Sequence, residues 1–378
     1  MLTKKILKNL FEFFRLFKII NKYANQNFKI VFYSENQTYQ KYSYILLNYL
    51  AENYPDEVLY VSSDKNDVLE NKKIIYLHIG NQFLLQFFFL KLKAKNLITT
   101  TTDLGNNILS KTKKVKNYIY YFHSPVSTTK VYTAKAFDNY DTILCIGEFQ
   151  KNEIQKREEI ENINKKKLIE CGYFYFEYLN KKINQNIIPD EILLAPSWNY
   201  DEKNFINEDF DLIIEHLIEN NLKIRFRPHP EHLKRSSKFI NYLKDKYSSK
   251  DFIFDNEIEN YISMEKAKCL ITDNSGIAIE YILILKKPVF YFESKYKIHN
   301  KDVGKFEDMF NIEEYIKKEF GYIFEKTQIK NLKEFINDNL KNFDNEKVLR
   351  INNFLNKNFY NFNKTSNFLD NNIKKIID

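Results

Sequence analysis

The sequence predicts an α/β protein in which two doubly wound parallel-sheet domains face each other across a cleft. Short apolar runs alternate with segments of helical periodicity, and this alternation pauses at a polar stretch, residues 179–191, before it resumes. The length of 378 residues leaves room for about two domains of roughly 150 residues each. We therefore expect one domain at 1–184, a second at 185–335, and C-terminal helices at 336–378 that pack back toward the first domain.

Both halves of the sequence show the same rhythm of elements. In the first half we predict strands at 28–35, 57–63, 72–80, 96–105, 117–125 and 140–148, with helices at 40–53 and 81–95. In the second half we predict strands at 191–199, 222–230, 251–255, 268–274 and 287–293, with helices at 209–221, 257–267 and 275–286. Apolar strands that alternate with helices are typical of a parallel sheet covered on both faces. Ligands of such sheets bind beyond the carboxyl ends of the strands, so polar strand ends are the candidate sites.

The composition excludes some classes of protein and partner. A hydrophobic fraction of 44% with 16% aromatic residues excludes a mainly disordered chain. The net charge of +8, from 58 basic and 50 acidic residues, suits an anionic small molecule, an anionic polymer or the inner membrane surface. This charge is dispersed, and no helix-turn-helix or zinc-finger spacing accompanies it, so we expect no nucleic-acid partner.

The cysteines and the N-terminal segment bear on location. Cys145, Cys171 and Cys269 are far apart in sequence, which favours neither a metal cluster nor a disulfide framework and indicates a reducing cytoplasm. The apolar stretch Ile6 to Ile20 is broken by charged residues, so we expect neither a signal peptide nor a membrane span there. It is instead either an interfacial helix on the cytoplasmic face of the inner membrane or a helix that packs on its own domain.

The strongest motif is the stretch "CLITDNSGIAIE", Cys269 to Glu280. A buried strand ends at Thr272-Asp273, and a turn then opens a helix whose first amides suit a phosphate. Glu280, about one helical turn later, is placed to accept the hydroxyl protons of a ribose. The alternative is that Asp273 or Ser275 only caps the helix. We predict phosphate or nucleotide contacts from the strand end and the turn: Thr272, Asp273, Asn274, Ser275 and Gly276.

Three further strand ends carry chemistry. In "RFRPHP" two prolines hold Arg227 and His229 at one rim, where a guanidinium and an imidazole suit a phosphate, unless the segment is only a rigid turn. "APSW" places Ser197 at another strand end of the second half. "YYFHSP" places His123 at a strand end of the first half, although a lone histidine is more often structural.

These motifs resemble a known family. "ILLAPSW", "RPHP" and "ITDNSGIAIEYILILKKPVFYF" look like the C-terminal half of the CDP-glycerol glycerophosphotransferases that build teichoic acids and some capsules. That family has the GT-B architecture of two Rossmann-like domains, with "APT", "RxHP" or "KxHP", and "TDYSS…D/E" elements. Gly276 stands where the family has its second Ser, and "HSP" at His123 to Pro125 resembles the family's "HG.P" segment without its Gly. The resemblance covers about Tyr118 to Glu293 and is weak over the first 110 residues.

The resemblance implies a transferase with a donor-binding C-terminal domain and an acceptor-side N-terminal domain. It would move glycerol phosphate, or a related alditol phosphate, from a CDP-activated donor to a cell-surface polysaccharide or lipid-linked acceptor, releasing CMP. His123 would be the general base, and His229 and Arg227 would stabilise charge on the transferred phosphoryl group. We expect no metal and no cofactor, because helix amides and an arginine supply the positive field.

Three alternatives stay open at this point. The first is a nucleotide-sugar-dependent GT-B glycosyltransferase of capsule or lipopolysaccharide synthesis. The second is an enzyme like the UDP-N-acetylglucosamine 2-epimerases, whose "TDSGGxQEE" loop resembles "TDNSGIAIE" but which need further acidic residues; Asp103 is the one such strand-end carboxylate that we identify. The third is a non-catalytic scaffold.

Overall fold

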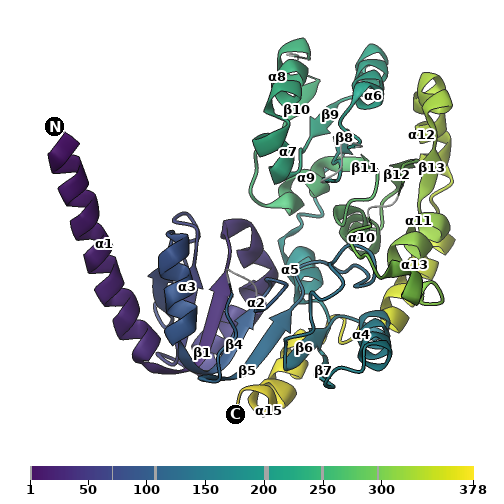
Figure 1. Ribbon diagram of the computed structural model, residues 1–378. Coiled ribbons are helices and arrows are strands. Elements are labelled where there is room, and N and C mark those ends of the chain that lie inside the picture. The colour runs from purple at the N-terminus through teal and green to yellow at the C-terminus, as the bar shows by residue number, and fades with distance from the viewer. Residues whose placement is uncertain (1, 70, 106–108, 200–203, 248–250, 296–297) are drawn as a thin grey trace. The chain divides into compact units, whose positions relative to one another are not determined.

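The computed structural model (Figure 1) describes residues 2–378 apart from 70, 106–108, 200–203, 248–250 and 296–297, and for residues 2–12 it describes the backbone alone. The chain forms two compact units. Unit 1 comprises Met1–His123, Tyr132–Tyr175 and Asn363–Asp378, and unit 2 comprises Ser124–Val131 and Phe176–Phe362. We call Ser124–Val131 the inserted segment, because the residues on either side of it belong to unit 1.

The compact units do not have the boundaries of the predicted domains. The chain changes unit between Tyr175 and Phe176, inside helix α5 (Phe174–Lys182), and not at 184/185. Of the C-terminal stretch that we expected to pack on the first domain, only Asn363–Asp378 belongs to unit 1. Helix α12 (Leu332–Lys341) and helix α13 (Asn345–Asn358) belong to unit 2.

Unit 1 is built on a parallel sheet with the strand order β3-β2-β1-β4-β5-β6-β7. Its strands are β1 (Asn27–Ser34), β2 (Val58–Ser62), β3 (Ile75–His78), β4 (Lys93–Thr99), β5 (Val115–Tyr121), β6 (Thr142–Cys145) and β7 (Lys167–Glu170). Its helices are α1 (Leu2–Asn25), α2 (Gln37–Asn53), α3 (Gln82–Lys91), α4 (Glu148–Ile160), α14 (Thr365–Phe368), η4 (Leu369–Ile373) and α15 (Lys374–Ile377).

One boundary differs from the sequence prediction for a clear reason. We expected a helix over 81–95, whereas α3 ends at Lys91 and β4 begins at Lys93. The burial of β4 alternates at its start, with Lys93 and Lys95 exposed and Ala94 buried, before the strand becomes fully buried. This period of two is the signature of a strand, and it overrides the helical pattern of the preceding residues.

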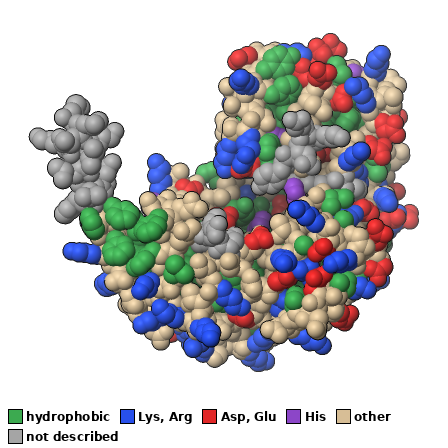
Figure 2. Space-filling view, viewed as in Figure 1, with side chains coloured by type: hydrophobic (Ala, Val, Ile, Leu, Met, Phe, Trp, Pro, Cys, Tyr) green, Lys and Arg blue, Asp and Glu red, His purple; other side chains and the backbone are tan. Residues whose placement is uncertain are grey.

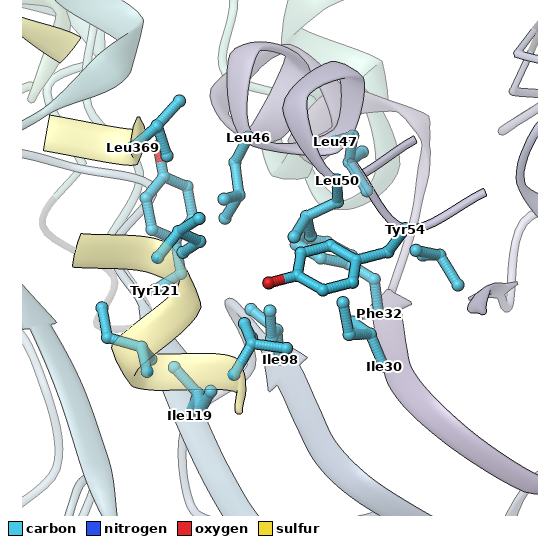
Figure 3. Packing of buried hydrophobic residues seen from close by; sticks show 14 of the residues in the cluster. Ile30, Phe32, Leu46, Leu47, Leu50, Tyr54, Ile98, Ile119, Tyr121 and Leu369 are labelled. Atoms are coloured by element: carbon cyan, nitrogen blue, oxygen red, sulfur yellow. The ribbon is translucent and has the colours of Figure 1, made fainter. Parts of the chain in front are cut away.

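The core on one side of this sheet is completed by the end of the chain (Figure 3). Leu46, Leu47 and Leu50 of α2 pack on the strand residues Ile30 and Phe32 within one buried cluster. That cluster also includes residues of the last helices, namely Phe368, Leu369, Ile373, Ile376 and Ile377. Helix α2 begins with a side-chain cap, in which Asn36 accepts a hydrogen bond from the amide of Thr38.

Unit 2 is built on a second parallel sheet, with the strand order β10-β9-β8-β11-β12-β13. Its strands are β8 (Glu191–Leu194), β9 (Ile224–Phe226), β10 (Phe252–Phe254), β11 (Ala267–Thr272), β12 (Val289–Phe292) and β13 (Tyr322–Phe324). Its other helices are α6 (Glu208–Glu219), α7 (Pro230–Arg235), α8 (Ser237–Lys246), α9 (Asn260–Lys266), α10 (Ile277–Glu280), η1 (Tyr281–Leu285), η2 (Val303–Phe306), α11 (Ile312–Phe320) and η3 (Lys326–Asn331).

The two sheets share one topology. In each, the first strand of the unit is third in the strand order, and the order reverses beside it, between β1 and β4 in unit 1 and between β8 and β11 in unit 2. Such a reversal is the topological switch point where open α/β sheets bind ligands. The predicted α/β class with two doubly wound parallel sheets is thus confirmed.

The N-terminal helix carries an apolar surface. Helix α1 contacts α3, with the rings of Phe17 and Phe87 4.8 Å apart. Phe14, Phe83 and Leu90 are more than half exposed, and Figure 2 shows hydrophobic side chains gathered beside the grey end of this helix. In the stretch 6–20 that we singled out, the side chains of residues 6–12 lie outside the described residues. None of the helices in the described part of the chain combines the length and apolar character needed to cross a bilayer.

Candidate functional site

The switch point of unit 2 is occupied by a bridge between two strand ends. Ser197, which follows β8, donates two hydrogen bonds to the carboxylate of Asp273, which follows β11: the amide at 2.7 Å and the hydroxyl at 2.6 Å. The Thr272 hydroxyl donates to the carbonyl of Ala195 at 2.7 Å, again across these two strands. All three side chains are buried. The structure therefore brings Ser197, Thr272 and Asp273 together at one point, and their predicted role in phosphate or nucleotide binding stays a prediction.

The turn at residues 274–276 follows directly and is held from one side. The Asn274 amide donates to the Ser294 hydroxyl at 2.9 Å and to the Lys295 carbonyl at 3.2 Å. Its Oδ1 atom is buried and has no hydrogen-bond partner among the described residues. Ser275 and Gly276 are half-buried and lead into α10. The turn therefore presents polar groups at the switch point without using them all internally.

Glu280 lies inside the unit, on the helix that follows this turn. Its side chain is buried, and Oε2 accepts a hydrogen bond of 3.0 Å from the amide of Asn260, also buried. Asn260 is the first residue of α9 and was absent from our candidate residues. The proposed contact of Glu280 with a ribose stays a prediction.

The "RFRPHP" segment divides into an internal and an exposed part. The Arg227 guanidinium forms an ion pair with Asp255 at 3.1 Å and donates to the Ile258 carbonyl at 3.2 Å, so much of its hydrogen-bonding capacity is used within unit 2. His229 is exposed and is the N-cap of α7, where its Nδ1 accepts from the Glu231 amide at 3.2 Å. His232 is fully buried, with Nε2 2.9 Å from the Ser197 carbonyl oxygen. Arg227 thus stabilises the loop, while His229 presents its ring at the surface.

The inserted segment contacts the same unit close to this turn. A Cβ atom at Gly276 would lie 3.0 Å from the Ser124 Oγ atom. The amide of Ser127 donates to Glu313 Oε1 of α11 at 3.0 Å, and Lys130 forms an ion pair with Glu314. The Glu313 Oε2 atom is buried without a partner among the described residues, and burial raises the pKa of this carboxyl to about 7.

A buried lysine completes this part of unit 2. The Lys317 side chain of α11 lies near Asp273, Glu293 and Glu314, whose negative charges each raise its pKa. Burial outweighs them and lowers the pKa of Lys317 below its usual value. Neither Glu313 nor Lys317 was predicted, because a charged helix rich in Glu and Lys gives no local signal of which side chains point inward.

His123 lies in unit 1, two residues beyond the end of β5. Its ring packs edge-on against Tyr39 at 4.8 Å between ring centroids, and its carbonyl oxygen accepts a hydrogen bond of 2.9 Å from the Tyr173 hydroxyl. The residue is half-buried, and its Nδ1 atom is buried without a partner in the described part of the chain. Burial lowers the pKa of this histidine to about 4, although the backbone of Thr100 raises it in part. The ring is therefore neutral at neutral pH and able to accept a proton.

The switch point of unit 1 carries a carboxylate that the sequence reasoning missed. Glu35 directly follows β1. Tyr33 of β1 pairs with Thr99 of the parallel strand β4, and Glu35 and Thr101 each lie two residues beyond this pair, so they are neighbours. Burial raises the pKa of Glu35, and the Thr101 side chain lowers it in part. Its position after the apolar run of β1 was the signal that could have found it. Asp103, the strand-end carboxylate that the sequence analysis identifies, has a left-handed backbone with φ of 60° and accepts hydrogen bonds from Thr102 and Thr133.

The two doubly wound parallel units define an α/β protein of the GT-B class. No family model matches the chain, and no curated protein matches its sequence. Among solved structures, the wall teichoic acid polymerase TagF is similar with a TM-score of 0.63 at 17% identity, over 99% of this chain and 96% of TagF. A TagF variant soaked with CDPG gives a TM-score of 0.59 at 18% identity, over 96% of this chain and 92% of that one.

A second group of similar structures consists of epimerases. The UDP-GlcNAc 2-epimerase of Methanocaldococcus jannaschii, in complex with UDP-GlcNAc and UDP, has a TM-score of 0.55 at 14% identity, over 82% of this chain and 92% of that one. At these identities the likeness shows a shared fold. The fold that the sequence resemblance implied is therefore confirmed, and it extends over the first 110 residues, where the motifs were weak.

Proposed function

We propose that this protein transfers glycerol phosphate, or a related alditol phosphate, from a CDP-activated donor to an acceptor hydroxyl. The acceptor oxygen attacks the β-phosphorus, the new O–P bond forms, and the bond from this phosphorus to the oxygen of the α-phosphate breaks. CMP leaves with that oxygen, and the acceptor proton passes to a base. The acceptor is a cell-surface polysaccharide or its lipid-linked precursor.

One observation carries the proposal most. The polar bridge from Ser197 to Asp273 and the adjoining 274–276 turn lie at the switch point of unit 2, in a chain whose fold follows TagF over 99% of its length. An open α/β sheet binds its ligand at that point. The donor phosphates would lie at the turn, with Glu280 on the ribose and the exposed ring of His229 near the transferred phosphoryl group.

His123 is the base in this scheme. A general base must be uncharged before it accepts the proton, and burial keeps the His123 ring neutral at neutral pH. Its unpartnered Nδ1 atom supports this role, because a histidine that serves only the core usually has both ring nitrogens satisfied. The proposed reaction needs this atom to reach the acceptor hydroxyl in the complex with both substrates.

The apolar surface of α1 and α3 suits a lipid-linked acceptor. Phe14, Phe83 and Leu90 are exposed, and Lys18, Lys22 and Lys91 belong to the same two helices. Aromatic and basic side chains together favour an anionic membrane surface. This surface supports the proposal of peripheral membrane contact, and the cytoplasmic face of the inner membrane is part of the same proposal. Co-sedimentation with vesicles of anionic and of neutral lipid tests it, and equal binding to both would contradict it.

The experiment that tests the function combines binding with turnover. Thermal shifts are compared for CDP-glycerol, CDP-ribitol, CMP and UDP-N-acetylglucosamine, since a ligand at 100 times its dissociation constant stabilises a protein by about 2.7 kcal/mol. The best donor is then incubated with a lipid-linked acceptor, and CMP release is measured for wild type and His123→Ala. The proposal fails if only the UDP-sugar stabilises the protein, or if CMP release needs no acceptor.

The similarity in fold to an epimerase supports a second candidate function, epimerisation of a UDP-sugar. Epimerisation at a sugar carbon needs carboxylates in the N-terminal half, and Glu35 and Asp103 both follow strands of unit 1. Incubation with UDP-N-acetylglucosamine in deuterated water decides this. Deuterium at the sugar C2 atom would favour the epimerase, and its absence would leave the transferase.

A further inference from the structure

The inserted segment brings a serine to the 274–276 turn of unit 2. A Cβ atom added to Gly276 would lie 3.0 Å from Ser124 Oγ and 4.0 Å from Val126 Cγ1. The first separation is tighter than an ordinary van der Waals contact of 3.4–4 Å. Among the described residues, the Ser124 hydroxyl has no hydrogen-bond partner, and the residue is half-buried. The hydroxyl therefore lies against the turn and remains available to a ligand.

The backbone does not require glycine at position 276. Gly276 has φ of −60° and ψ of −27°, a right-handed helical conformation that any L-residue adopts. A side chain at position 276 would have little space, because the Ser124 hydroxyl lies 3.0 Å from where its Cβ atom would be. Gly276 itself carries no side chain at the turn. The space beside its Cα atom is taken by the hydroxyl of Ser124.

Several contacts hold the inserted segment on the rest of unit 2. Glu313 accepts the amide hydrogen of Ser127 at 3.0 Å, and Lys130 pairs with Glu314. The Lys130 carbonyl oxygen also accepts from the amides of His299 at 2.8 Å and Asn300 at 3.1 Å. These contacts involve both the middle and the end of the inserted segment, so its backbone is fixed on unit 2 a few residues from Ser124.

We propose that Ser124 supplies a hydroxyl that binds a phosphate oxygen at the 274–276 turn, and that Gly276 leaves the room for it. The inference rests on the proposed function, which puts the donor phosphates at this turn. The sequence departs twice from the pattern of the family that it resembles: Ser replaces Gly after His123, and Gly replaces the second Ser of the loop. On this inference the two departures compensate for each other. The hydroxyl is kept, and the residue that carries it changes.

The test is a swap. Four proteins are compared with wild type: Ser124→Ala, Ser124→Gly, Gly276→Ser, and the double variant Ser124→Gly/Gly276→Ser. Affinities are measured for CDP-glycerol and for inorganic pyrophosphate, which carries the same diphosphate chemistry without the cytidine. Melting temperatures of all variants show whether each has folded, and Ser124→Ala removes the hydroxyl with the least change to the backbone.

We expect Ser124→Ala to weaken both ligands by about tenfold, since a hydrogen bond to a charged group is lost. Gly276→Ser should weaken them as well, because its Cβ atom would lie 3.0 Å from Ser124 Oγ and the hydroxyl would have to move from its place at the turn. The double variant should return to within about threefold of wild type. Unchanged pyrophosphate affinity in Ser124→Ala, or a double variant no better than Gly276→Ser, would overturn the inference.

The two ligands separate this inference from the proposed function. If wild type binds pyrophosphate with the expected pattern but not CDP-glycerol, the CDP donor is wrong and the role of Ser124 stands. If CDP-glycerol binds and turns over while Ser124→Ala behaves as wild type, the function stands and the role of Ser124 is wrong. Binding of neither ligand by wild type would overturn both.

Discussion

The buried carboxyl of Glu313 makes the stability of unit 2 depend on pH in a defined direction. Burial raises its pKa from 4.5 to about 7, while the nearby Lys130 ammonium lowers it and the Glu314 carboxylate raises it. The folded protein therefore holds a proton in a pH range where the unfolded chain has released it. Stability must then fall as the pH rises from 4.5 toward 7 and stay low above that.

The magnitude follows from this difference in pKa. Each pH unit within the interval changes the free energy of unfolding by about 1.36 kcal/mol, so the whole interval accounts for at most about 3 kcal/mol. In Glu313→Gln the neutral amide still offers an oxygen to the Ser127 N–H group and no longer titrates. The buried amide adds a constant cost at all pH values, so the slope of stability with pH is the quantity to compare.

The assay uses the single tryptophan of the chain. Trp198 belongs to unit 2, so its fluorescence during urea unfolding reports on this unit. Measurements from about pH 5 to about pH 9 should show the wild type losing up to about 3 kcal/mol more than Glu313→Gln. The matched control is Glu319→Gln on the same helix, where the exposed side chain pairs with Arg350 at 2.6 Å. Parallel pH profiles for wild type and Glu313→Gln would refute the reasoning.

Three further outcomes are expected. His123→Ala should lower kcat by at least about 100-fold while donor affinity, measured by calorimetry, stays within about threefold of wild type. In a pH–rate profile, the wild-type kcat/KM should fall only toward about pH 4, where the ring is protonated. A fall already near pH 6.5 would contradict the lowered pKa of His123. Asp273→Ala should destabilise unit 2 by about 2–5 kcal/mol in urea unfolding, because the Ser197 amide and hydroxyl lose their acceptor. Glu280→Ala should weaken nucleotide binding in calorimetry, whereas Glu215→Ala, on a half-exposed helix face, should bind as wild type does.

The sequence was most informative where strands are buried on both faces. Strands such as β1, β5 and β11 are near-continuous apolar runs, which is the pattern of a parallel sheet covered by helices. Strand β7 was not predicted, because it is a short strand at the edge of its sheet, with Lys167 and Glu170 exposed and Leu168 and Ile169 only partly buried. Strand β13 was missed for the same reason, being a short edge strand of three residues.

For the candidate site, sequence motifs predict the positions of polar residues but not their partners. Motifs placed Ser197 and Asp273 at strand ends, and only the strand order shows that β8 and β11 are neighbours, so that the two residues meet. The contact of Ser124 with Gly276 joins residues 152 positions apart, and no local pattern predicts it. The pKa of Glu313 likewise depends on burial against a distant segment.

The way the last helices complete the core of unit 1 constrains how the chain is made. Leu369 lies in the same buried cluster as Ile30 and Phe32 (Figure 3). Ile373 and Ile377 belong to that cluster as well. A ribosome synthesises all of unit 2 before it reaches these residues. Until then unit 1 cannot complete its core, and part of its apolar surface stays uncovered. Unit 2 can complete its fold before unit 1 does, because all of its residues precede Asn363–Asp378, which complete unit 1. A nascent chain stalled just before Asn363 would therefore expose an apolar face for chaperones to bind.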